Sequence, residues 1–219
     1  MLAGLGLASV LCVALELFRE RHFGATGYRF LLWNLFLAWI PLVLALVAYD
    51  RYRRRVRVAG LVPALVLWLL FLPNAPYIVT DFIHLSSASA APLWFDGVMV
   101  SAFAWTGVLL GFVSLYLVHA VARHRFGAAI GWSWVCGALA LVSVGVYLGR
   151  FKNWNSWDLL VRPGARLGEL HTRLADPSSL GRAFGATLGL TLLLMLGYLV
   201  FYVLMRARFE PQAAQRPRD

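Results

Sequence analysis

The sequence predicts an all-α integral membrane protein, a helix bundle with about six transmembrane helices in a single domain over residues 1–209. Of 219 residues, 61% are hydrophobic and only 14% are charged, and the mean hydropathy is +0.72. Soluble chains are about half apolar and about a quarter charged, so this chain has too little polar surface for a water-facing globule. Residues 210–219 are rich in Arg and Pro, and we expect them to form a disordered cytoplasmic tail.

Each predicted span is an apolar run close to the roughly 20 residues that cross a hydrocarbon core. The first run lacks a basic start and continues through Glu16 to Arg19, which favours a span over a cleavable signal. The third run is short, because Pro73 and Pro76 each remove a backbone donor and disfavour helix before them. The runs lie near residues 2–18, 30–49, 57–72, 97–121, 128–149 and 184–205.

The short loops predict the orientation of the bundle. Arginines gather between the second and third runs and again at 123–125, whereas 73–96 contains no Lys or Arg. Because basic residues are enriched in cytoplasmic loops, we expect 73–96 and 150–183 outside and both termini in the cytoplasm.

Composition also excludes some classes of function. The formal net charge is +10, but the arginines stand at the ends of apolar runs rather than on one continuous basic face. We therefore expect no nucleic-acid partner. Cys12 and Cys136 are single residues within apolar runs, which indicates neither a disulfide nor a metal site.

Polar residues gather at the outer ends of the predicted spans. Polar groups at membrane depth are costly unless paired, so their convergence from separate stretches predicts a ligand- or substrate-binding site at the extracytoplasmic face. Glu16 lies at the same level in the first run. The candidate binding residues are Asn34, Asn74, Tyr77, Thr80, Asp96, Asn153, Asn155, Ser156 and Trp157, and the candidate catalytic residues are Asp81, His84, Arg150 and Asp158.

Residues 77–85 are expected to form a short interfacial or re-entrant helix after the third span. At helical spacing Thr80, Asp81 and His84 share one face. Arg150 is a natural partner for Asp81 or Asp158, because intramembrane charges are normally paired. Asn74 has an equally good structural role, which is to bond backbone groups that the two prolines leave free.

Three segments of the chain resemble a known family of bacterial membrane proteins, the domain of unknown function number thirteen sixty-one. They are residues 33–41 (Trp-Asn-Leu-Phe-Leu-Ala-Trp-Ile-Pro), 72–85 (beginning Leu-Pro-Asn-Ala-Pro-Tyr, with Thr-Asp and His-Leu further on) and 148–158 (beginning Leu-Gly-Arg-Phe). The resemblance implies a small polytopic protein of the bacterial plasma membrane. It implies no activity.

Three classes of function fit these observations. An enzyme at the outer leaflet would use Asp81 and Asp158 as acid and base, His84 as a proton shuttle and Arg150 as an anion clamp. A transporter would use the broken third span as a gate, although the cytoplasmic halves of the spans carry few polar residues. An assembly protein would instead dock a membrane-protein partner.

The motifs narrow the chemistry further. The sequence has no nucleophile elbow, HExxH, Walker or dinucleotide motif, so we expect no metal and no cofactor. The expected partners are the lipid bilayer and either a lipid-linked or small polar ligand or a membrane protein. An enzyme should show an open pocket at Asp81, His84 and Asp158, and a scaffold should show Asp81 and Arg150 paired and sealed.

Overall fold

The computed structural model describes residues 1–24, 26–85, 90–152 and 177–209. Every regular element in these ranges is helical, as the sequence predicts. Six segments are long and apolar enough to cross a membrane, so the chain is a multi-pass membrane protein. Apart from the third span, they are α1 (Leu2–Phe23), α2 (Phe30–Arg53), α5 (Leu93–Phe126), α6 (Ala128–Lys152) and α9 (Pro177–Phe209).

The third span is longer than the sequence predicts. It extends over Val62–His84 rather than ending at residue 72. After a short 3-10 turn, η1 (Val58–Gly60), its consecutive pieces are α3 (Val62–Phe71), α4 (Asn74–Tyr77) and the 3-10 helix η2 (Ile78–His84). The expected helix over 77–85 is therefore a 3-10 continuation of this span, and its interfacial or re-entrant character stays a prediction.

The two prolines allow this continuation because of where they stand. Pro73 is the N-cap of α4 and Pro76 is its third residue. The first backbone N–H groups of a helix have no intrahelical partner, so a proline there removes no bond. The side-chain amide of Asn74 donates to the carbonyl oxygen of Phe71 at 2.9 Å. The structural role expected for Asn74 is thus present.

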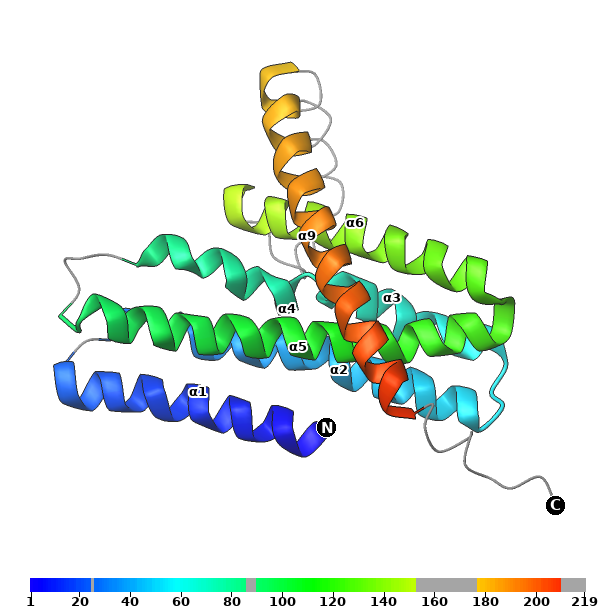
Figure 1. The fold of residues 1–219 in the computed structure, drawn as a ribbon, viewed down its shortest axis with the longest axis horizontal. Helices are drawn as coiled ribbons and strands as arrows, with labels where there is room; N and C mark the ends of the chain where they lie inside the picture. The colour runs from blue at the N-terminus through cyan, green and yellow to red at the C-terminus, as the bar shows by residue number, and fades with distance from the viewer. Residues whose placement is uncertain (25, 86–89, 153–176, 210–219) are drawn as a thin grey trace.

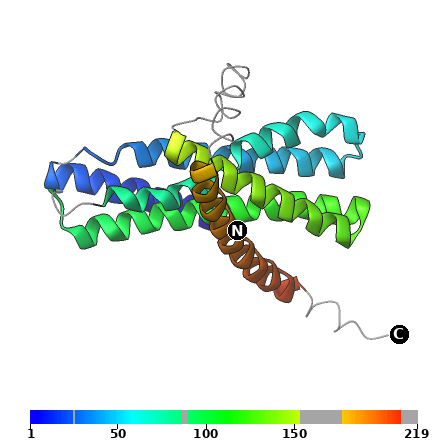
Figure 2. The same cartoon turned by 90° about the horizontal axis from the view of Figure 1, so that it is seen from above.

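α5 is the central and most buried helix of the bundle. α1, α2, α6 and the third span pack against it (Figures 1 and 2). Gly107 allows α4 to lie very close to α5, because a Cβ at this position would be 2.5 Å from the carbonyl oxygen of Ala75 on α4. Small residues at such contacts let membrane helices approach closely, and this one fixes the interrupted part of the third span on α5.

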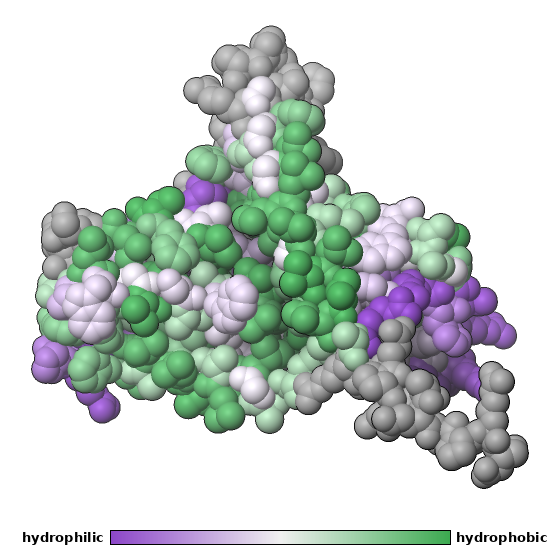
Figure 3. Space-filling view, viewed as in Figure 1, coloured by the Kyte–Doolittle hydropathy of each residue, from purple (hydrophilic) through white to green (hydrophobic). Residues whose placement is uncertain are grey.

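The bundle has two ends that differ in chemistry. α1 ends, η2 lies and α5 begins at one end, which we call the Asp81 end. α2 and α5 both end at the other, which we call the arginine end. Figure 3 shows hydrophobic residues over the middle of the bundle and hydrophilic residues gathered mainly at the two ends. This distribution suits a chain that spans a bilayer.

α9 is the most exposed of the spans. It packs mainly on α6, and its first half projects beyond the other helices in Figure 1. Its exposed residues are large and apolar, among them Leu192, Leu196 and Leu204. In a bilayer such a surface faces lipid.

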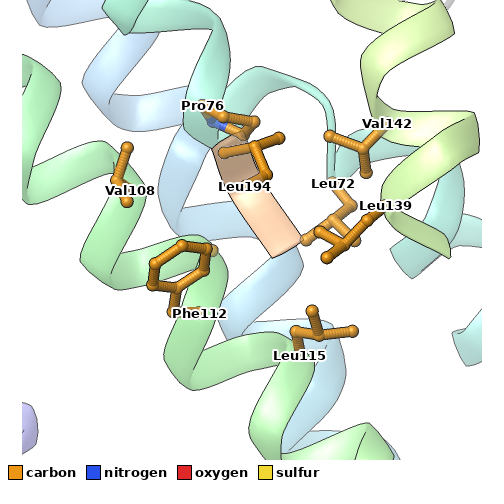
Figure 4. Close-up of a pocket in the computed structure, with 9 residues that line it drawn as sticks. Leu72, Pro76, Val108, Phe112, Leu115, Leu139, Val142 and Leu194 are labelled. Atoms are coloured by element: carbon orange, nitrogen blue, oxygen red, sulfur yellow. The ribbon is translucent and has the colours of Figure 1, made fainter. Parts of the chain in front are cut away.

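A small apolar crevice lies where the third span, α5, α6 and α9 meet (Figure 4). Its volume is about 10 Å³, and its lining is apolar, with Leu72, Phe112 and Leu139 among the side chains. A cavity needs roughly 10–15 Å³ and several polar partners to hold even one water. The crevice is therefore a packing defect rather than a ligand site.

Candidate functional site

The strongest polar cluster in the described chain surrounds Asp81. Its members come from α2, the third span and α6, three parts of the sequence that are far apart. We call it the Asp81 cluster, and its residues are Asn34, Tyr77, Thr80, Asp81, His84 and Arg150.

Arg150 is the centre of this cluster. One nitrogen of its guanidinium donates to Asp81, with which it forms an ion pair. Nε donates to the hydroxyl of Thr80 at 2.7 Å, and Nη1 lies 3.0 Å from Nε2 of His84. The guanidinium carbon lies 4.6 Å from the centre of the Tyr77 ring, a cation–π distance. The expected pairing of Arg150 with Asp81 is therefore confirmed, as is the common face of Thr80, Asp81 and His84.

Asp81 itself is sealed. Its side chain is 1% exposed, that of Arg150 is 10% exposed, and His84 is exposed. The second carboxylate oxygen of Asp81 accepts a hydrogen bond of 2.9 Å from the amide of Asn34. Both oxygens are thus used, as a buried carboxylate requires. The cluster is exposed to the surroundings mainly at His84.

A second ion pair lies close by, between α1 and the start of α5. Arg19 donates to the two carboxylate oxygens of Asp96 at 2.6 and 3.2 Å, and both side chains are buried. Such two-point geometry is the strong form of an Arg–carboxylate contact. Asp96, expected among the binding residues, therefore belongs to a neighbouring pair and not to the Asp81 cluster.

Tyr28 links the Arg19–Asp96 pair to His84 of the Asp81 cluster. The guanidinium of Arg19 lies 4.5 Å from the centre of the Tyr28 ring. The hydroxyl of Tyr28 donates to the backbone carbonyl of His84 at 2.7 Å. Burial, together with the nearby charge of Asp96, raises the pKa of the Tyr28 hydroxyl. The hydroxyl therefore stays a hydrogen-bond donor over a wide pH range.

Sequence reasoning missed Arg19 and Tyr28 as members of this polar network. A signal for Arg19 was present, because Cys12, Glu16 and Arg19 follow one another at helical spacing along one face of α1. All three are buried against α5, where the thiol of Cys12 lies 3.5 Å from the hydroxyl of Thr106. A polar stripe in an otherwise apolar span predicts a packed face. Tyr28 carried no such signal.

Glu16 is the exception to the pairing in this region. Its side chain is fully buried, and neither carboxylate oxygen has a hydrogen-bond partner among the described residues. An isolated carboxylate in a low-dielectric interior is costly and is neutralised by binding a proton. The burial of Glu16 therefore favours the neutral, protonated form of its carboxyl group.

Part of the predicted site lies outside the described residues. These positions are Asn153, Asn155, Ser156, Trp157 and Asp158. Their expected roles, including that of Asp158 as an acid or base, stay predictions. The tail at 210–219 also lies outside the described ranges.

The fold and these buried pairs define a class, the polytopic membrane helix bundle with ionic contacts at one end. The chain belongs to the family described as "Protein of unknown function (DUF1361)", whose match covers residues 33–203. The matched range contains the whole Asp81 cluster. No curated protein matches the chain, and no solved structure matches it.

Proposed function

We propose that this is a multi-pass protein of the bacterial plasma membrane that binds a polar ligand at its extracytoplasmic face, through His84 and Arg150. Its termini are cytoplasmic. The observation that carries the proposal is the preorganised guanidinium of Arg150, which Asp81, Thr80 and Tyr77 hold beside an exposed imidazole.

The orientation rests on the arginine end. Tyr52 and His124 are in contact there, at 2.6 Å, so the arginines after α2 and those at the end of α5 lie on the same side. Basic loops are retained in the cytoplasm. The Asp81 end then faces the outside of the cell.

The hydrogen-bonding groups of His84 and Arg150 indicate the class of ligand. A neutral His84 that accepts a hydrogen bond from Arg150 through Nε2 carries its proton on Nδ1, and it can donate that proton to a ligand. The guanidinium edge is also a donor. Both groups suit an oxygen acceptor, such as a carboxylate, a phosphate or a sugar hydroxyl of a lipid-linked molecule.

The contacts of Asp81 favour a positioning role over an acid–base role. Its two oxygens are engaged by Arg150 and Asn34, and its side chain is 1% exposed. A general acid or base must reach the substrate proton within hydrogen-bond distance. Binding therefore fits this cluster better than acid–base catalysis by Asp81.

A second candidate is an assembly protein that docks a membrane partner and binds no small ligand. The observation that favours it is the sealed Asp81–Arg150 pair, which is what a purely structural contact would show. The exposed ring of His84 favours the first candidate, because a structural lock does not need it.

The test has a topology arm and a binding arm. In a Cys12→Ser/Cys136→Ser background, a membrane-impermeant maleimide added to intact cells should label His84→Cys, and should label Arg55→Cys only after the inner face is opened. Met99→Cys, at a fully buried position, is the protected control. If only Arg55→Cys were labelled from outside, the true orientation would be the opposite of the one proposed.

The binding arm uses native mass spectrometry of the purified chain. We expect the wild type to retain a polar adduct that His84→Ala loses and that Ile83→Ala, at the exposed neighbouring position, keeps. Identical spectra for all three proteins, with no adduct, would reject ligand binding and leave the assembly protein.

A further inference from the structure

The arginine end contains a basic hollow, which the proposed ligand site does not involve. It lies between the end of α2, the turn that follows and the end of α5, and its volume is about 440 Å³. This is within the range of roughly 300–1,000 Å³ typical of small-molecule sites. Its lining residues are Tyr52, Arg53, Arg55, Val56, Arg57, His124 and Arg125.

Hydrogen bonds hold the wall of the hollow in place. The hydroxyl of Tyr52 lies 2.6 Å from Nδ1 of His124, which ties α2 to α5 across the bundle. The turn is closed by backbone hydrogen bonds from Arg55 to Tyr52 and from Val56 to Arg51, at 2.9 and 3.1 Å. Arg55 has a φ of 57°, in the left-handed region that costs a non-glycine residue energy. The hydrogen bonds of the turn hold its arginines in place despite this backbone strain at Arg55.

The charges in the hollow are of one sign. In the part of the chain that the structure describes, four arginines and no carboxylate line it. The nearby Asp50 is engaged by Arg54 at 2.7 Å, and Arg51 donates to the carbonyl of Gly60 at 3.1 Å. Among the described residues, the four lining arginines form no salt bridge. Like charges held this close repel, so an anion in the hollow would stabilise the folded end.

Topology alone does not require this arrangement. Arginines that only retain a loop in the cytoplasm can be spread over the surface, each in contact with water. Here they converge on one concavity whose wall is tied across two spans. Convergence of this kind indicates a ligand.

We propose that the basic hollow binds the phosphate of an anionic phospholipid headgroup. The hollow lies at the ends of two membrane spans, where headgroups are the most abundant anions. The guanidinium groups of arginines match phosphate oxygens in two-point contacts. In the orientation proposed above, the hollow is on the cytoplasmic side, where basic pockets between spans bind anionic headgroups. Val56 and Phe126 are exposed beside the arginines and offer apolar contact to the glycerol and acyl region.

The test titrates the full-length chain in detergent and measures bound lipid by native mass spectrometry. Phosphatidylglycerol should bind, and phosphatidylcholine, which has the same phosphate but no net charge, should bind at least about tenfold more weakly. Each arginine near a membrane surface contributes about 1 kcal/mol of attraction, so Arg55→Gln/Arg57→Gln should weaken phosphatidylglycerol binding about 30-fold.

The matched control removes the same charge from the same turn. Arg51→Gln/Arg54→Gln changes arginines that already have partners, and it should weaken binding less than about threefold. Equal losses in the two double variants would overturn the site in favour of general surface charge. Equal binding of both lipids would also overturn it, and displacement of phosphatidylglycerol by millimolar inorganic phosphate would assign the hollow to a soluble anion instead. The lipid comparison uses only the wild type, so equal binding of the two lipids would overturn the proposal even if a variant fails to fold.

Discussion

Removal of Arg150 tests the buried ion pair directly. Arg150→Met keeps a long apolar stem but leaves Asp81, which is 1% exposed, without its cation. Removal of one partner from a buried pair costs about 3–5 kcal/mol, because the other charge stays buried and uncompensated. Replacement of both partners by apolar residues of similar volume is often neutral or stabilising. We therefore expect Asp81→Leu/Arg150→Met to recover most of the loss.

The assay is equilibrium unfolding in mixed micelles with a rising fraction of SDS, followed by tryptophan fluorescence. The matched control is Arg54→Met, which breaks a pair whose side chains are 74% and 58% exposed. Exposed pairs contribute at most about 1 kcal/mol. A loss for Arg150→Met as small as that for Arg54→Met would show that the Asp81 cluster does not hold the bundle together.

Three further predictions use the same assay. Gly107→Ala should destabilise by about 1–3 kcal/mol, because its Cβ would lie 2.5 Å from a backbone oxygen, whereas Gly97→Ala on the same helix has open space and should be neutral or slightly stabilising. Glu16→Met should stabilise by about 1–3 kcal/mol, because it removes a buried carboxyl group without a partner, and a loss would mean that a partner exists. Tyr28→Phe should cost about 0.5–1.5 kcal/mol through the lost hydrogen bond to the His84 carbonyl, and no change would remove Tyr28 as the link.

The sequence predicted the helical class and six spans because both depend on composition and on the length of apolar runs. It also predicted that Arg150 pairs with Asp81 or Asp158, since a charge at membrane depth needs a partner. It did not decide between Asp81 and Asp158 as that partner. The structure shows the contact with Asp81, which the packing of the third span beside α6 brings about, and Asp158 lies outside the described residues.

The course of the third span was harder to predict. Pro73 and Pro76 are usually signs of an ending, and the sequence alone does not show that they stand in the first turn of a new helix. The close fit of that turn on Gly107 is a tertiary effect, which local propensity does not contain. The pairing of Asp96 with Arg19 depended likewise on which helices are neighbours.

The two ends of the bundle hold their charges in opposite ways. At the Asp81 end, Arg150 and Arg19 are buried and matched one to one with carboxylates. At the arginine end, the lining arginines of the basic hollow are exposed and lack ion-pair partners among the described residues. A buried pair is a poor source of stability compared with apolar packing, so the matched end is better explained by the precise placement of Arg150 beside His84. At the arginine end, the proposed phospholipid phosphate would balance the charge of the lining arginines.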